Sequence, residues 1–202
     1  MLALLGSHAL NHYKYVRTPM DMDLLGTYED CVDYIKQLGK RERIVANYPA
    51  DSGKKIIVKT NSPELKIYEF EVAWPDSDSE ALLKIIHDGE WSEKRVVPGY
   101  DKPTIFTVPT LNILYMLKMS HRYRKDSPHF KKTMDDILFM RSLGAKMLDE
   151  HMDWFKLREK NTYTNTLPKL NQSKKSFFKD DVPYTYDHDS IHQAIKRDEF
   201  PA

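Results

Sequence analysis

Cysteine is almost missing from this chain of 202 residues, which contains only Cys31. One thiol cannot form an internal disulfide, and it excludes a structural zinc site built from several cysteines. A chain that does without disulfides fits a reducing compartment, so we expect a cytoplasmic protein.

Long hydrophobic runs are also missing. The apolar opening at Met1 to Leu5 is shorter than the core of a signal peptide and has no basic flank. No other apolar run approaches the roughly 18–20 residues of a membrane-spanning helix. We therefore expect no export signal and no membrane partner.

An excess of charge of either sign is absent, because 31 lysines and arginines face 30 aspartates and glutamates. A balance this close excludes a chain that binds polyanions over its whole surface, so any such site must be local. The glycine-rich dinucleotide and P-loop motifs and the Gly-x-Ser-x-Gly turn of serine hydrolases are absent as well. Nothing therefore predicts a dinucleotide cofactor or a serine nucleophile.

The residues that are present predict a globular α+β chain, with 41% hydrophobic and 11% aromatic residues. Apolar periodicity and turn residues predict strands at 2–5, 21–25, 43–48, 55–60 and 65–74, and helices at 8–16, 28–38, 78–87, 108–123, 130–143 and 147–157. We expect a mixed sheet with covering helices over 1–105, a helical part over 106–158, and a polar arm with the C-terminal segment over 159–202. The segment 159–181 reads as a long loop.

The first candidate site combines Gly6-Ser7 with Asp21-Met22-Asp23. Gly6-Ser7 lies at a predicted strand-to-helix turn, where glycine lets a phosphate approach the backbone and serine supplies a hydroxyl. Residues two apart on a strand face the same side, so Asp21 and Asp23 project together, about 6–7 Å apart at their α-carbons. Two such carboxylates can share a hard divalent cation, and magnesium prefers oxygen ligands.

A third acid is available on the strand predicted at 65–74. Glu69 and Glu71 share one face of it, opposite Tyr68 and Phe70. Either glutamate can complete a site that holds two metal ions, or accept a proton from an attacking hydroxyl. An alternative is that all these carboxylates belong to a solvated face of the sheet.

These residues resemble the opening signature of the minimal nucleotidyltransferases of the polymerase-beta superfamily, and especially its abortive-infection toxin branch. The matching elements are Gly6-Ser7, Ala9-Leu10, Arg17 and Asp21-Met22-Asp23. The resemblance implies a nucleotidyltransferase-like fold, with Asp21, Asp23 and Glu71 holding Mg²⁺ or Mn²⁺. It also implies that Gly6, Ser7 and Arg17 bind the phosphates of a nucleoside triphosphate.

A second similarity to that family concerns Lys118 and the acidic pair Asp135-Asp136. Lys118 follows an almost wholly apolar helical stretch, so its charge requires a partner. That partner is either the triphosphate, as the resemblance implies, or one of the two aspartates; alternatively, the side chain carries its charge along its aliphatic stem to solvent. Arg122 belongs to a basic run from 121 to 132, which is either a solvated surface or a region that steers a nucleotide or RNA.

The sequence thus predicts transfer of a nucleotidyl group to an acceptor hydroxyl on RNA, a protein or a small molecule. Hydrolysis of a nucleotide at the same carboxylates, or nucleotide binding without catalysis, are the alternatives. Two other motifs offer metal ligands, His87-Asp88 and Asp187-His188-Asp189 with His192. His121 and Asp136 could join the first, but His87 lies at the end of its predicted helix beside Gly89. The second has no other ligands at a suitable spacing and reads as a surface segment.

Overall fold

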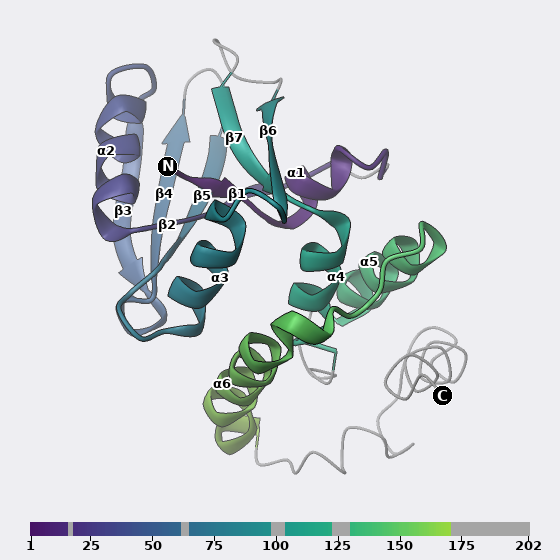
Figure 1. Cartoon of the computed structure of the whole chain (residues 1–202). Helices are drawn as coiled ribbons and strands as arrows, with labels where there is room; N and C mark the ends of the chain where they lie inside the picture. The colour runs from purple at the N-terminus through teal and green to yellow at the C-terminus, as the bar shows by residue number, and fades with distance from the viewer. Residues whose placement is uncertain (16–17, 62–64, 98–103, 123–129, 171–202) are drawn as a thin grey trace. The chain divides into compact units, whose positions relative to one another are not determined.

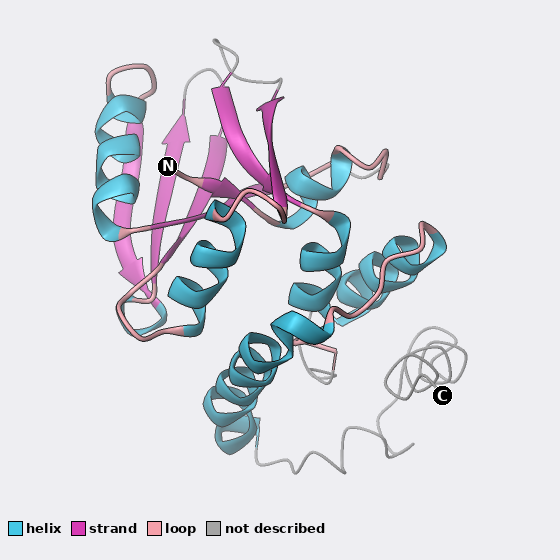
Figure 2. Cartoon of the chain, viewed as in Figure 1, coloured by secondary structure: helices cyan, strands magenta, loops and turns pink. Residues whose placement is uncertain are grey.

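The computed structural model describes residues 1–15, 18–61, 65–97, 104–122 and 130–170, with side chains up to residue 162. The chain divides into two compact units, Met1–Leu114 and Tyr115–Ala202. In the described part of the chain, every strand belongs to the first unit (Figure 2). The expected α+β class, a mixed sheet followed by a helical part, is confirmed.

The first unit contains a seven-stranded mixed sheet in the order β3-β4-β5-β2-β1-β7-β6 (Figure 1). β2 is parallel to β5 and β1 is parallel to β7, whereas the other neighbours are antiparallel. The strands are β1 (Ala3–Leu4), β2 (Asp21–Gly26), β3 (Ile44–Ala50), β4 (Lys55–Asn61), β5 (Leu65–Val72), β6 (Ser92–Val97) and β7 (Thr104–Pro109).

The helices of this unit are α1 (Gly6–Asn11), α2 (Tyr28–Gly39) and α3 (Asp78–His87), with a short 3₁₀ turn at Asp51–Gly53. Thr27 caps the start of α2 because its hydroxyl accepts the N–H of Asp30 at 3.1 Å, and Ser77 caps α3 in the same way. Figure 1 shows α2 running alongside the sheet. Its Tyr34 ring contacts the rings of Phe70 and Phe106, so α2 covers the face on which these phenylalanines lie.

The opposite face of the sheet carries the acidic residues. Along β5, Tyr68 and Phe70 are fully buried, whereas Glu69 and Glu71 between and after them are half-buried. This alternation is the period of two that the sequence predicts. It leaves the glutamates on the side that α2 does not cover.

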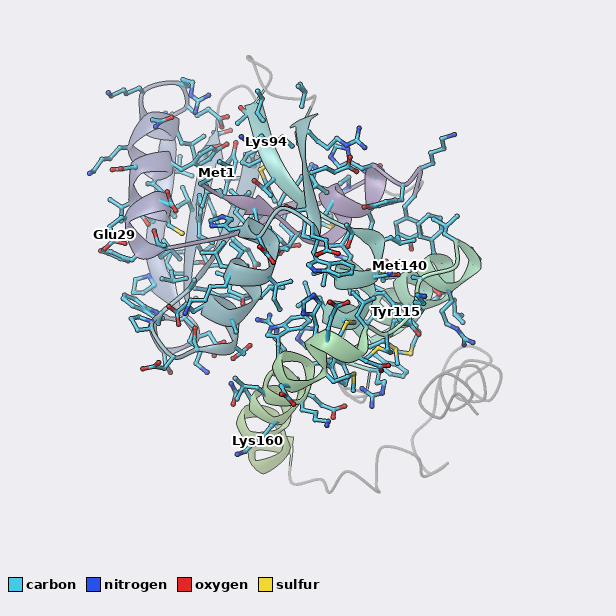
Figure 3. All side chains as sticks on the ribbon, in the orientation of Figure 1. Met1, Glu29, Lys94, Tyr115, Met140 and Lys160 are labelled. Carbon is cyan, nitrogen blue, oxygen red and sulfur yellow. The ribbon has the colours of Figure 1, made fainter. Side chains whose placement is uncertain are left out.

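The second unit is helical in its described residues. It contains the end of α4 (Leu111–Met119), then α5 (Phe130–Ser142), a 3₁₀ turn at Asp149–His151 and α6 (Met152–Leu170). Tyr115 on α4 and Met140 on α5 are fully buried, whereas Lys160 on α6 is exposed; Figure 3 labels all three. No helix in the described ranges combines the length and apolarity that crossing a bilayer requires.

Two strands were not predicted. β7 runs to Pro109, which the sequence pattern assigned to the start of a helix; its Thr-Ile-Phe-Thr-Val run has the β-branched and aromatic residues that favour a strand, and proline ends that run. β6 escaped prediction because its central residues are charged and exposed, as is common for a strand at the edge of a sheet.

Three helices have different ends from those expected. α4 stops at Met119 instead of about Tyr123. α1 stops at Asn11 instead of Val16, and Lys14 shortly after it has a positive φ of 65°. α6 continues to Leu170, through part of the segment expected to be a loop from residue 159. Its first turns bury Trp154 and Phe155, and extending an existing helix is cheaper than nucleating one. The rest of the predicted arm, residues 171–202, lies outside the described residues.

Candidate active site on the carboxylate face of the sheet

Asp21 and Asp23 lie on the same face of β2. Both are half-buried, while Met22 and Leu24 on the other face are buried in the core. The burial of these alternate apolar side chains fixes which way the strand faces, because a shift of one residue would place the carboxylates in the core. The local sequence therefore determines that the two aspartates project together.

The parallel pairing of β2 with β5 brings the glutamates to the same face. Asp23 is the register partner of Glu69, and Leu25 is the partner of Glu71. Neighbouring strands lie about 4.8 Å apart, so Glu69 is the glutamate beside Asp23. Glu71 lies one side-chain position farther along, where its carboxylate accepts a hydrogen bond from the hydroxyl of Ser79 on α3. We call Asp21, Asp23, Glu69 and Glu71 the carboxylate face.

Gly6 backs this face at the bend between β1 and α1. Its φ is +61°, and a β-carbon built on it would overlap the carboxylate of Asp23, with the Cγ only 2.8 Å away. A backbone hydrogen bond also joins the bend to β2: the N–H of Leu5 donates to the carbonyl oxygen of Asp23 at 2.8 Å. The structure thus brings the glycine bend and Asp23 together.

Lys55 joins the carboxylate face from β4, and sequence reasoning missed it. Its ammonium lies 3.0 Å from Oε2 of Glu69, and its register partner is Glu71. Burial by itself lowers the pKa of Lys55, but attraction to Glu69, Glu71 and Asp23 outweighs burial and raises that pKa. The sequence did contain a signal for this residue. Lys55 begins the strand predicted at 55–60, and that strand is expected to form a hairpin with the strand that carries the two glutamates.

His8 adds a second titratable group near Asp21. Burial lowers the pKa of His8 below its ordinary value, and this effect is larger than the opposing attraction to Asp21; His12 nearby lowers it further. His8 is therefore mostly neutral at neutral pH. A neutral imidazole beside the aspartates adds no positive charge that would compete with a bound cation.

The residues predicted to bind phosphate lie in different parts of the chain. Ser7 is buried, with 1% of its surface exposed, and Arg17 lies outside the described residues. Lys118 and Arg122 belong to the second unit. There the ammonium of Lys118 lies 2.9 Å from Oδ2 of Asp136, an ion pair that was one of the explanations the sequence offered for this charge.

Arg122 is not part of a solvated basic surface. It is buried, its guanidinium lies 2.6 Å from the carboxylate of Glu159, and it also lies over the ring of Phe155, 5.6 Å from the centroid. These contacts hold α6 to the end of α4. Of the rest of the basic run, Arg124 lies outside the described residues and Lys131 pairs with Asp135.

The fit of a metal ion can be judged from the donor set. Within the described residues, no three histidine, cysteine, aspartate or glutamate side chains lie close enough together to hold an ion by themselves. Magnesium, however, is commonly bound through one or two carboxylates, with substrate phosphates and water completing its shell. Asp21 and Asp23, half-buried on one face with Glu69 beside them, fit that mode of binding.

The two other motifs that offered metal ligands lie elsewhere. His87 is the last residue of α3 and Asp88 is its C-cap, and the motif at 187–192 is outside the described residues.

Known proteins give limited guidance. Residues 113–202 match the model of a family described as a domain of unknown function, DUF7275. No curated protein matches the chain. A crystal structure of an antigenic nucleotidyltransferase-like protein from Paracoccidioides brasiliensis is similar over 87% of this chain and 84% of that chain, with 14% identity and a TM-score of 0.46. A similarity of that size carries no functional argument, so function must rest on the residues of the carboxylate face.

Proposed function

We propose that this chain transfers a nucleotidyl group from a nucleoside triphosphate to an acceptor hydroxyl, in a reaction that requires Mg²⁺ or Mn²⁺. The observation that supports it best is the carboxylate face itself. Asp21 and Asp23 point to one side of β2, Gly6 leaves room for Asp23, and Glu69 lies in register on the parallel neighbour. This arrangement joins both halves of the motif that resembles the minimal nucleotidyltransferases.

Asp21 and Asp23 would hold the ion jointly with phosphate oxygens of the substrate. When bound, the ion would neutralise charge on the phosphates and favour the deprotonated acceptor oxygen. The acceptor oxygen then attacks the α-phosphorus, the bond to the β-phosphate oxygen breaks, and pyrophosphate leaves. The proton of the acceptor hydroxyl passes to a carboxylate, for which Glu69 and Glu71 are the two candidates on this face.

The geometry of the described residues supports metal binding at Asp21 and Asp23 better than it supports phosphate binding. Ser7 is buried, and Lys118 and Arg122 have carboxylate partners in the second unit. Their roles toward phosphate, and that of Arg17, remain predictions from the sequence. The proposal depends on Asp21 and Asp23 and does not need these residues.

Incubation with α-labelled and γ-labelled nucleoside triphosphates, Mg²⁺ and candidate acceptors tests the proposal. RNA, protein and small hydroxyl compounds serve as acceptors, and the label is followed into acceptor, pyrophosphate or inorganic phosphate. Transfer with pyrophosphate release supports the proposal, whereas inorganic phosphate without a labelled acceptor supports hydrolysis instead.

Variants identify the site that does the chemistry. Asp21→Asn and Asp23→Asn should each lower the rate by at least about 100-fold, the size of effect seen when one group that stabilises a charged transition state is removed. Asp33→Asn on the exposed side of α2 is the matched control and should keep full activity. Activity that survives in the Asp21 and Asp23 variants would contradict the proposal.

A further inference from the structure

Lys55 occupies a position on the carboxylate face that the proposed chemistry does not require. Its ammonium lies 3.0 Å from Oε2 of Glu69, within reach of a charge-assisted hydrogen bond. On one side Glu69 is the register partner of Asp23 on β2, and on the other Lys55 reaches it diagonally from β4, where the register partner of Lys55 is Glu71. The order across the sheet is therefore cation, glutamate, aspartate and glycine bend.

The surroundings of Lys55 show that it is held as a charged group. Its side chain is 38% exposed, and that of Glu69 is 27% exposed, so the pair is partly withdrawn from water. Glu69, Glu71 and Asp23 all attract the ammonium, and together they overcome the effect of burial. The ammonium of Lys55 therefore lies among the carboxylates of this face.

This charge bears on how many ions the face can hold. Sites with two metal ions place them about 3.5–4 Å apart, and a shared carboxylate commonly bridges them. Glu69 is the acid beside Asp23 that is placed to serve as such a bridge, yet one of its oxygens already accepts from Lys55. A second divalent ion there would lie near the ammonium and be repelled by it.

We propose that the carboxylate face takes a single divalent ion, at Asp21 and Asp23, and that Lys55 supplies the positive charge that a second ion would otherwise provide. This inference rests on the proposed function, because it assumes that the face binds a divalent ion. Lys55 acts as a positioning residue: it orients Glu69 and leaves Asp21 and Asp23 as the ligands of the ion.

Titration of the full-length chain with Mn²⁺ alone, with free Mn²⁺ followed by electron paramagnetic resonance, tests the inference without an activity measurement. The wild type should bind one ion per chain. Lys55→Met should bind a second ion, or bind the first roughly tenfold more tightly, because a repelling charge has been removed. Lys55→Arg keeps the charge and should behave as the wild type does.

Lys54→Met is the matched control, since Lys54 is the exposed neighbour that precedes β4. It should leave the number of ions and their affinity unchanged. Two ions in the wild type, or the same binding in Lys55→Met as in Lys54→Met, would overturn the inference and leave the proposed function standing. Absence of Mn²⁺ binding in all four proteins, both with Mn²⁺ alone and with a nucleoside triphosphate present, would overturn the proposed function itself.

Circular dichroism checks that each variant is folded before it is titrated. If Lys55→Met does not fold, the number of ions in the wild type and in Lys55→Arg still decides the matter. One ion supports the inference, and two overturn it.

Discussion

The carboxylate of Asp23 occupies the space that a side chain at position 6 would fill. Gly6 also has a φ of +61°, a conformation that L residues with a side chain rarely adopt. Two independent reasons therefore require glycine at this bend, and one of them concerns a residue of the candidate active site. A substitution at the bend therefore also affects Asp23 on β2.

Replacing Gly6 with alanine should destabilise the protein and move Asp23. The positive φ alone costs about 1–2 kcal/mol for a residue with a β-carbon, and displacement of the Asp23 carboxylate adds to it. Chemical denaturation measures the free energy of unfolding, and a Mn²⁺ titration measures the effect on the carboxylate face.

Gly89→Ala is the control for that variant. Gly89 has a φ of +84° and nothing within 4 Å of where a β-carbon would lie, so only the backbone cost applies. The Gly89→Ala variant should lose about 1–2 kcal/mol of unfolding free energy and should keep Mn²⁺ binding. Equal losses and unchanged Mn²⁺ binding in both variants would show that the contact of Gly6 with Asp23 has no influence.

Removal of the Lys118 ammonium should destabilise the helical unit. Asp136 is 0% exposed and lies 2.9 Å from that ammonium, so Lys118→Met removes a cation that stabilises a buried carboxylate. The expected loss is about 3–5 kcal/mol, measured by chemical denaturation. The double variant Lys118→Met with Asp136→Leu should recover most of this loss, because no buried charge remains.

Lys131→Met is the matched control on α5. Lys131 pairs with Asp135 at the same distance of 2.9 Å, but both side chains are largely exposed. Lys131→Met should lower the free energy of unfolding by less than about 1 kcal/mol. Full stability in Lys118→Met would argue instead that Lys118 is kept for a ligand such as a triphosphate.

Stability should fall as the pH drops below the ordinary range of histidine. Burial lowers the pKa of His8 and, together with the charge of Arg95, that of His12. The unfolded chain therefore binds more protons than the folded one between the lowered pKa values and the ordinary value of about 6.5. The stabilisation that comes from keeping these histidines neutral is fully present above about pH 6.5 and is lost as the pH falls through their lowered pKa values.

Denaturation between about pH 7.5 and 5.5 measures this dependence. The His8→Gln variant should show a shallower decline of unfolding free energy with falling pH, and His8→Gln with His12→Gln a shallower one still. An unchanged slope in the double variant would contradict the assignment.

Cys31 should resist alkylation in the folded protein. Its side chain is fully buried in α2, and burial raises the pKa of the thiol to about 12, so the reactive thiolate is scarce at neutral pH. Iodoacetamide should modify the native chain very slowly and the urea-unfolded chain rapidly, as mass spectrometry can follow. Rapid modification of the native protein would show that α2 opens readily from the sheet.

Several elements of the first unit were predictable because their signals are local. β2, α2, β4 and α3 start at or near the expected residues, since alternation of apolar side chains and the caps Thr27 and Ser77 depend on neighbours in the chain. β6 and β7 were missed because an edge strand and a proline-ended strand carry weaker or conflicting local signals. The end of α6 was missed because packing of its first turns extends a polar helix.

The sequence alone determined that Asp21 and Asp23 share one side of a strand, and that Glu69 and Glu71 share one side of another, because side-chain direction follows from backbone geometry within a few residues. Only the tertiary structure decided that these strands are parallel neighbours, that Glu69 rather than Glu71 lies opposite Asp23, and that Lys55 reaches Glu69 from a third strand. Register between strands depends on how the whole sheet buries its apolar face, and that is a property of residues far apart in the chain.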